Sequence, residues 1–108
     1  MTVKDFAEKS SFGVLCMPSP DREIEGVYIG DLLSWVMGRA ESGEAWITIM
    51  SNINIVAVAT LSDVSCVILS EGVRLEAEVL STAASKGINI LCTELSSYDA
   101  AVKIHGII

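Results

Sequence analysis

Polar residues follow several apolar segments of this chain, at the corners where a strand is expected to give way to a helix. When strands are parallel, their carboxyl ends meet at one edge of the sheet, where α/β proteins usually bind ligands. Several helices would begin at this edge, and their positive N-termini suit an anionic small molecule. We therefore expect the ligand-binding residues to be Gly30, Asp31, Ser51, Asn52, Asn54, Glu71 and Thr93.

Carboxylates at the same corners favour a different chemistry. Asp31, Glu71 and Glu94 would bring negative charge to this edge of the sheet. Carboxylate oxygens are the ligands of hard divalent cations, so a metal ion or a cationic group competes with the anionic ligand. The alternative function is accordingly a small metal-assisted enzyme that uses these three carboxylates.

The common catalytic signatures are missing from the sequence. The segment from Gly38 to Ala45 has two glycines at the spacing of a phosphate-binding loop, but Glu44 and Ala45 occupy the places of the required Lys and Ser or Thr. A single histidine, His105, is too few for a histidine-rich metal site, and it suits the C-terminal end of a last helix. We expect no catalytic residues, no metal site and no P-loop, and the sequence leaves the cofactor unknown.

The charge of the chain excludes several classes of partner. Seven Lys and Arg residues against fourteen Asp and Glu residues give a net charge of −7. Nucleic-acid binding draws most of its affinity from basic side chains that neutralise phosphates, and here the basic residues are scattered. No apolar run approaches the ~20 residues of a membrane helix, and no signal-peptide core follows Met1. We therefore expect a cytoplasmic protein that binds neither nucleic acid nor membrane.

The apolar residues indicate an aliphatic core. They make up 51% of the chain, whereas aromatic residues make up only 6%. This apolar fraction is slightly above the globular average, which hints at a homo-oligomer interface. The three cysteines are far apart, form no C-x-x-C pair and fall in predicted strands, so we expect buried, reduced thiols at Cys16, Cys66 and Cys92.

The chain is organised around the stretch from Asp21 to Val36, which contains a charged turn, a short strand at Val27–Ile29 and then a helix. Asp31 stands where the N-cap of that helix should be. Trp35 lies just outside the apolar arc, where it fits either ordinary edge packing or the anchor of a dimer contact. The residues expected on the apolar face of the helix are Leu32, Leu33, Val36 and Met37.

The remaining pattern predicts a regular alternation of strands and helices. For Ile55–Leu61 the β-branched residues favour a strand, but Asn52 or Asn54 would cap a helix and a parallel sheet needs a crossover, so a helix is predicted. The expected fold is a single-domain α/β sandwich over residues 1–108, with a parallel sheet, helices on both faces and the strand order left open. The other predicted strands are Gly13–Cys16, Ala45–Met50, Ser65–Ser70 and Ile88–Cys92, and the other predicted helices follow Thr2, span Arg74–Lys86 and follow Ser96.

Asp21-Arg22, the glycine at Gly26 and the segment from Tyr28 to Ser34 resemble the DRTGG domain family. The resemblance implies a fold similar to the N-terminal domain of HPr kinase/phosphorylase, without its kinase domain. Such domains are commonly regulatory partners of enzymes or of paired CBS domains. The sequence departs from the family at Glu23 and Val27, which replace its threonine and second glycine, and at Asn52, where many relatives have a histidine.

Together, the missing catalytic motifs and the resemblance predict a non-catalytic regulatory domain for ligand sensing or assembly. We expect a homodimer that binds a small anionic or nucleotide-like ligand or a partner protein, with Trp35 at the interface.

Overall fold

Five strands form one sheet in the order β1-β5-β4-β3-β2 in the computed structural model, which describes residues 1–108. Strands β2 to β5 are parallel, as the sequence predicts, whereas β1 pairs with β5 in the antiparallel direction. The strands are β1 (Gly13–Cys16), β2 (Gly26–Ile29), β3 (Glu44–Thr48), β4 (Cys66–Leu69) and β5 (Ile90–Cys92). The helices are α1 (Val3–Ser10), α2 (Leu33–Arg39), α3 (Asn54–Ser62), α4 (Ala77–Ser85) and α5 (Ser97–Ile107).

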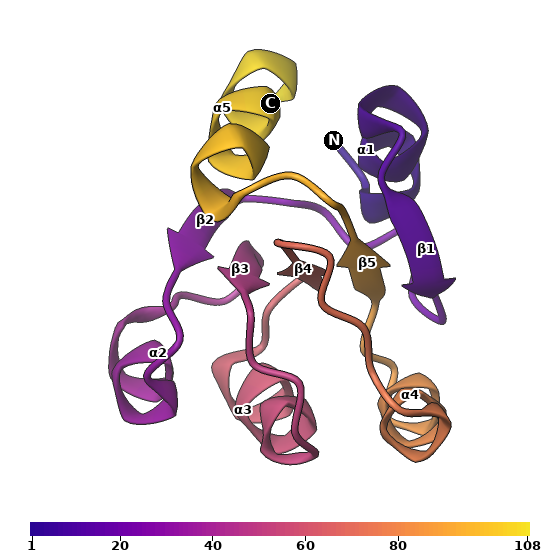
Figure 1. Ribbon diagram of the computed structural model, residues 1–108, viewed down its shortest axis with the longest axis vertical. Helices are drawn as coiled ribbons and strands as arrows, with labels where there is room; N and C mark the ends of the chain where they lie inside the picture. Colours follow the sequence, from indigo (N-terminus) through magenta and orange to yellow (C-terminus); the bar gives the residue numbers. More distant parts are fainter.

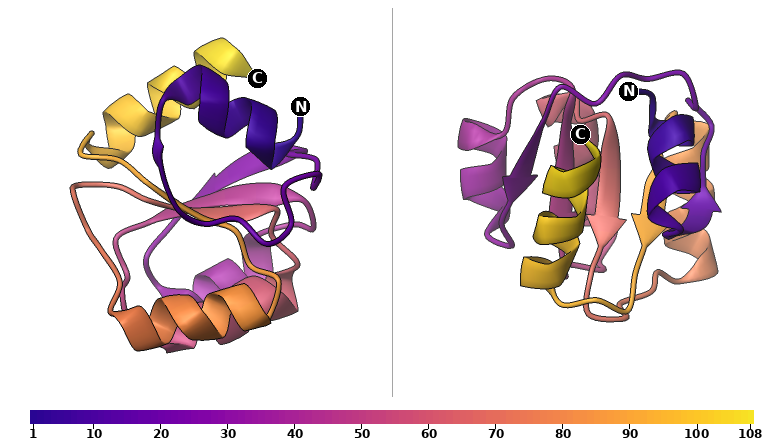
Figure 2. Two further views of the ribbon diagram at one scale, coloured as in Figure 1. Left: turned by 90° about the vertical axis from the view of Figure 1, so that its right-hand side faces the viewer. Right: turned by 90° about the horizontal axis from the view of Figure 1, so that it is seen from above.

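The helices cover both faces of the sheet, as expected. Each of the crossover helices α2, α3 and α4 moves the chain one strand further in the same direction, so these three helices lie together on one face. Helices α1 and α5 cover the other face (Figures 1 and 2). No helix is both long and apolar enough to span a lipid bilayer.

Two aliphatic clusters hold the layers together. Trp46 is fully buried between the sheet and α2–α4, and its indole N–H donates to the carbonyl of Gly30 at 2.8 Å. On the other face, Phe6 of α1 is fully buried and contacts Phe12 edge-on. All four residues of β4 are buried, as expected of a central strand covered on both faces.

Helix α3 confirms the prediction for Ile55–Leu61, although its start differs from the expected cap. The N-cap residue is Ile53, and it makes no side-chain capping bond. Asn52 still supplies a local acceptor, because its Oδ1 receives the backbone N–H of Asn54 at 2.9 Å. The side-chain amide of Asn52, which lies one position before the N-cap, therefore stabilises the turn into the helix.

The predicted N-cap role of Asp31 is wrong. Helix α2 begins at Leu33, its N-cap is Leu32, and no side chain caps it. The carboxylate of Asp31 instead turns to the end of β3, where a buried hydroxyl and a backbone amide need an acceptor. Only Val36 of the expected apolar face is buried, and both Leu32 and Met37 are at least half exposed.

Other elements are shorter than predicted. Helix α4 begins at Ala77 rather than Arg74, because the backbone is still extended at Glu76 (φ −67°, ψ 153°). The turn that precedes this extended segment is made by Glu71 and Gly72, which both have left-handed backbone angles (φ +59° and +75°). At its other end, Gly87 has φ +77°, which confirms the predicted glycine stop. Strand β3 ends at Thr48, two residues before the predicted end.

The cysteines are all free, but they are not equally buried. Cys66 and Cys92 are buried as predicted, and burial raises the pKa of the Cys66 thiol to about 12. Cys16 is only partly buried, contrary to the prediction, because β1 is the edge strand of the sheet. Partial desolvation still raises the pKa of the Cys16 thiol above its usual value.

Candidate functional site

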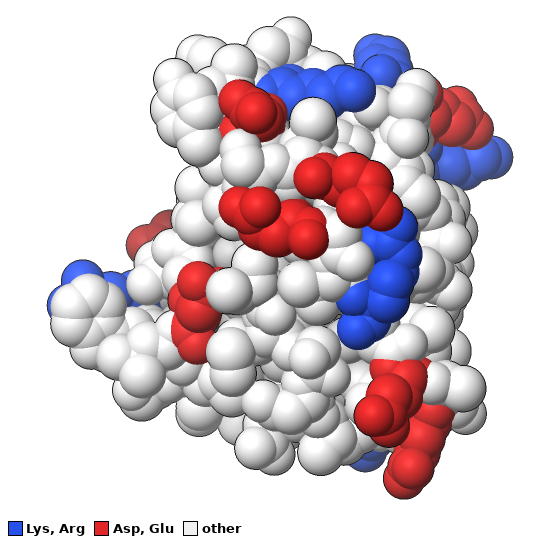
Figure 3. Space-filling model, viewed as in Figure 1, with Lys and Arg blue, Asp and Glu red and all other residues white.

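The carboxyl ends of β2 to β5 meet at one edge of the sheet, which faces the viewer in Figure 1. Acidic side chains gather over the middle of this face, with one basic side chain directly beside them (Figure 3). Every residue of the predicted ligand site lies on a loop or helix start along this edge. These residues nevertheless belong to three separate regions along the edge.

The first is the corner between β2 and β3. Asp31 Oδ1 accepts a hydrogen bond from the hydroxyl of Thr48 at 2.8 Å and from the backbone N–H of Ile49 at 3.0 Å. Gly30 is also engaged, because its carbonyl accepts from the indole of Trp46. Both residues therefore fasten the turn after β2 to the end of β3.

The second is the start of α3. Ser51 and Asn52 line a pocket of about 450 Å³ together with Ile53, Glu76, Glu78 and Val79. Asn54 lines a different, more apolar groove of about 450 Å³ between α3 and α4. Two carboxylates in the first pocket make its surroundings acidic.

The third is the junction of β4, β5 and α5. Glu71 Oε2 accepts from the backbone N–H of Ser97, the first residue of α5, at 3.3 Å, and the hydroxyls of Ser70 and Ser97 lie 2.6 Å apart. The amide of Gly72 donates to the carbonyl of Thr93 at 3.0 Å. Glu71 and Thr93 are thus brought together, and their loops connect β4 to the beginning of α5.

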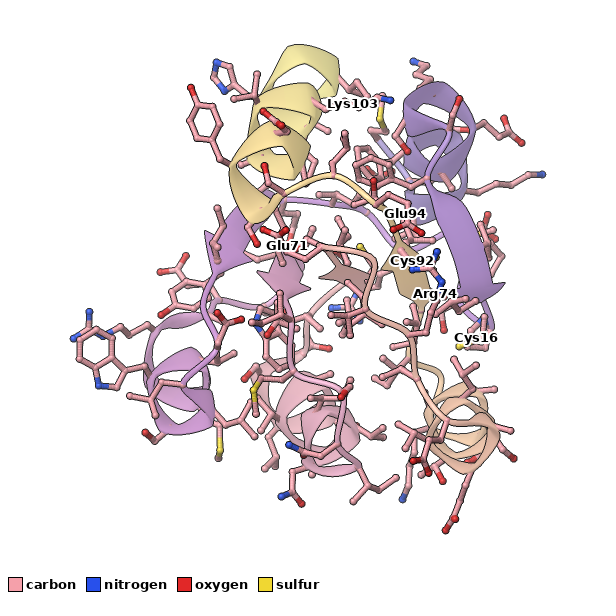
Figure 4. All side chains as sticks on the ribbon, in the orientation of Figure 1. Cys16, Glu71, Arg74, Cys92, Glu94 and Lys103 are labelled. Atoms are coloured by element: carbon pink, nitrogen blue, oxygen red, sulfur yellow. The ribbon has the colours of Figure 1, made fainter.

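A pocket of about 330 Å³ opens beside this junction, and Thr93 lines it. Arg74 contributes a guanidinium group that lies 3.0 Å from the carboxylate of Glu94 (Figure 4). A second cation stands nearby, because Lys103 Nζ lies 5.6 Å from the ring centroid of Phe12, another lining residue. The full lining is Ser11, Phe12, Gly13, Arg74, Cys92, Thr93, Glu94 and Leu95.

The close approach of β1 to β5 shapes the floor of this pocket. A Cβ atom on Gly13 would lie only 2.7 Å from Cys92 Sγ, so any side chain at this position would displace the Cys92 thiol. The antiparallel pairing of Gly13 with Cys92 therefore places the turn after α1 against the end of β5.

The three carboxylates considered for metal chemistry bind different partners. Asp31 accepts from Thr48 and Ile49, Glu71 from Ser97, and Glu94 from Arg74. No three His, Cys, Asp or Glu side chains are grouped in a way that could hold a metal ion.

The Asp21-Arg22 pair lies at the opposite edge of the sheet, where the strands begin. Arg22 Nη2 donates to the backbone carbonyl of Asp63 at 2.7 Å and lies 3.0 Å from its carboxylate. A hydrogen bond from Ser42, and then the charge of Arg22, lower the pKa of Asp63. Arg22 thus joins the segment before β2 to the end of α3, which is a structural role.

Sequence reasoning did not include Arg74 or the turn from Ser11 to Gly13 in the site. Arg74 was expected inside a helix, and the direction of β1 was not predicted. The one available signal was an arginine two residues after the Glu71-Gly72 turn, at the edge where ligands were expected.

Comparison with solved structures shows a similar fold in the regulatory region of a Clostridium perfringens pyrophosphatase, which contains CBS and DRTGG domains and is complexed with its activator, diadenosine tetraphosphate. The TM-score is 0.74 at 16% sequence identity, and the match covers 95% of this chain and 45% of that chain. This chain therefore spans less than half the length of that regulatory region. No curated protein matches it. The sequence model of the DRTGG domain matches residues 8–107, and the chain belongs to the DRTGG domain family.

Proposed function

We propose that this chain is a non-catalytic regulatory domain that acts as a homodimer and senses a small anionic, nucleotide-like ligand at the pocket beside Arg74. The observation that carries the proposal is an arginine in a pocket at the carboxyl edge of a parallel sheet, the usual ligand position in α/β folds. The similar pyrophosphatase region, which binds a dinucleotide activator, supports the same class of ligand.

The ion pair of Arg74 and Glu94 can be exchanged for a ligand at small cost. Both side chains are exposed, and exposed ion pairs contribute only about 0–1 kcal/mol to stability. The guanidinium group can instead bind a phosphate through two parallel hydrogen bonds, which are stronger because they are charge-assisted. Lys103 does not line the pocket, but its ammonium group lies 5.6 Å from the ring centroid of the lining residue Phe12 and adds positive charge to the surroundings.

Ligand binding at this pocket would be transmitted to α5 through the neighbouring loops. Thr93 contacts the ligand in this proposal, and its carbonyl already accepts from Gly72. The adjacent Glu71 holds the first amide of α5. A ligand that draws Glu94 away from Arg74 therefore acts on the segment that leads directly into α5, which gives the domain a route from ligand to partner.

The other predicted residues receive distinct roles. We assign to Asp31 and Glu71 the positioning of the loops at this edge, since each carboxylate accepts backbone hydrogen bonds. Ser51, Asn52 and Asn54 remain predicted ligand contacts, but they line pockets beside α3 that are separate from the Arg74 pocket.

Thermal melts of the full chain with diadenosine tetraphosphate, ATP and inorganic phosphate test the proposal. A ligand at about a hundred times its dissociation constant adds roughly 2.7 kcal/mol of stability, which raises Tm by ~10 °C or more in a domain of this size. Arg74→Ala should abolish this shift. Lys4→Ala is the control, because it removes one positive charge from an exposed side chain in the first turn of α1 that does not line the pocket. If no compound stabilises the chain, or if Arg74→Ala keeps the full shift, the proposal is wrong.

Glu94→Gln separates an anionic ligand from a cationic one. The variant frees Arg74 and removes a carboxylate from the pocket. An anion should then bind more tightly, whereas a metal ion or a cationic ligand should bind more weakly. Melts with Mg²⁺ and Mn²⁺ alone supply the comparison.

A further inference from the structure

Helix α3 lacks the charged outer face of an ordinary surface helix. Its nine residues include no Asp, Glu, Lys or Arg. Two apolar residues of the helix, Ala57 and Leu61, are exposed, and the side chain of Leu61 is 70% exposed. The preceding residue, Ile53, is 46% exposed. A helix that is apolar on its outer side as well as its inner side is normally buried on both.

A groove of about 450 Å³ follows this helix, between α3 and its neighbour α4 (Figure 1). Six of its eight lining residues come from α3 or from Ile53, and Lys86 is the only charged residue among them. Ile53, Ala57 and Leu61 recur every four residues, so they form one line along the helix. We call these three residues and the groove the α3–α4 face. Its small central residue, Ala57, lets another helix approach closely.

Charges at the ends of this face are separated by sign along α4. Glu76 is the N-cap of α4 and Glu78 lies in its first turn, whereas Lys86 is its C-cap. All three side chains are exposed, and none of them takes part in an ion pair. Helix α3 has a charge only at its C-cap, Asp63, which is already paired with Arg22. One end of α4 is therefore negative and the other is positive.

We infer that a second copy of this chain docks on the α3–α4 face, with the helices of the two copies antiparallel about a two-fold axis. Such an axis brings the same surface of both copies together. If it passes beside Ala57, then Ile53 of each copy meets Leu61 of the other, because these two residues lie four positions to either side. The same rotation sets Lys86 of each copy against the Glu78 end of the other copy's α4, so unlike charges meet at both ends.

The distribution of charge argues for a second copy in this orientation. With a net charge of −7, two copies of this chain repel each other at long range, so an interface needs local complementarity. A parallel arrangement would bring Glu76 and Glu78 of both copies to the same end. In the antiparallel one, Asp63 faces the start of the other copy's α3, whose first turn is not acidic and whose dipole is positive there. The inference rests on the homodimer of the proposed function and locates its interface.

A matched pair of leucine variants tests the inference by native mass spectrometry and sedimentation at micromolar concentration. Leu61→Lys places a charge in the middle of the proposed interface. Leu32→Lys makes the same change at a side chain that is 59% exposed and does not line the groove. We expect a dimer for the wild-type chain and for Leu32→Lys, and a monomer for Leu61→Lys. Hydrogen exchange of the central strand β4 shows that each variant is folded.

Trp35 supplies a second comparison, because the sequence predicts it as the interface anchor and it does not line the groove. We expect Trp35→Ala to remain a dimer. A monomeric Trp35→Ala variant beside a dimeric Leu61→Lys variant would move the interface to α2 and overturn the inference.

Charge reversal tests the antiparallel orientation itself. Lys86→Glu should raise the dimer Kd by at least about tenfold, because it sets like charges against each other. Adding Glu78→Lys should restore the dimer. The two positions lie about 12 Å apart along one helix, so they cannot pair within a copy, and both changes oppose the dipole of α4. Recovery therefore requires contact between copies. A monomeric wild-type chain, or a double variant that dimerises no better than Lys86→Glu, would overturn the inference.

The ligand site and the dimer interface fail separately, because the Arg74 pocket and the α3–α4 groove share no lining residue. A folded, monomeric Leu61→Lys variant that still gains stability from diadenosine tetraphosphate or ATP confirms the interface independently of the ligand site. A wild-type dimer that is indifferent to every compound and is dissociated by Leu61→Lys refutes the proposed ligand and leaves the interface in place.

Discussion

Replacing Asp31 by alanine should destabilise the domain by about 2 kcal/mol, because two hydrogen bonds worth roughly 1 kcal/mol each are lost. One of them satisfies the hydroxyl of Thr48, which is buried, and the other satisfies the amide of Ile49. For a domain of this size, such a loss lowers Tm by roughly 10 °C. Urea unfolding followed by circular dichroism at neutral pH measures the difference.

Asp31→Asn is the matched control, since its amide oxygen can accept both hydrogen bonds without the charge. We expect this variant to retain the stability of the wild-type chain to within about 0.5 kcal/mol, the usual effect of a harmless surface change. The hydrogen-bond explanation is refuted if Asp31→Ala is as stable as the wild-type chain, or if Asp31→Asn destabilises the chain as much as Asp31→Ala does. Ligand melts of the stable Asn variant then test separately whether the charge of Asp31 contributes to binding.

Three further predictions concern the framework. Asn89→Ala should lower the free energy of unfolding by about 3 kcal/mol in urea titrations, because a buried amide that bonds Ser19 twice and Ser65 once is lost; a loss below about 1 kcal/mol would contradict this. The lowered pKa of Asp63 means that its contribution to stability is present above the usual carboxyl pKa and is lost as the pH falls through the folded pKa. In the Ser42→Ala variant, the pKa of Asp63 should be higher than in the wild-type chain, and an NMR titration of the carboxyl group measures this difference. An unchanged pKa would show that Ser42 does not lower it. Cys66, with a pKa of about 12, should resist a thiol reagent at mildly alkaline pH until the chain is unfolded, and mass spectrometry of the labelled native protein would reveal any modification that contradicts this.

The fold could be predicted because its main signals are repeated along the chain. Alternating strand and helix segments predicted parallel pairing for β2 to β5, and the need for a crossover correctly outweighed the strand propensity of Ile55–Leu61. The capping serine of α5 and the glycine after α4 were also confirmed, because both signals act within a few residues.

The predicted N-cap role of Asp31 was wrong because its actual hydrogen-bond partners are distant in the sequence. An acid before an apolar run looks the same whether it caps its own helix or binds elsewhere, and Thr48 lies on another strand. Nothing local to Asp31 shows that partner. The predicted start of α4 was also wrong, because the backbone is still extended at Glu76 and the helix begins only at Ala77.

The Arg74 pocket was beyond the reach of pattern reasoning. Its lining combines the turn after α1 with the end of β5, and these two segments meet only because β1 is antiparallel. Periodicity predicts that Gly13–Cys16 is a strand, but it carries no information on the direction in which that strand joins the sheet.

The register irregularity in β1 also limits how far these molecules can associate. A sheet with two regular open edges could add strands at both ends and grow into a fibre. Here the irregular far edge resists a further strand, while β2 offers a regular one. An edge that resists strand addition at one end of the sheet therefore prevents the open-ended growth that two regular edges would allow.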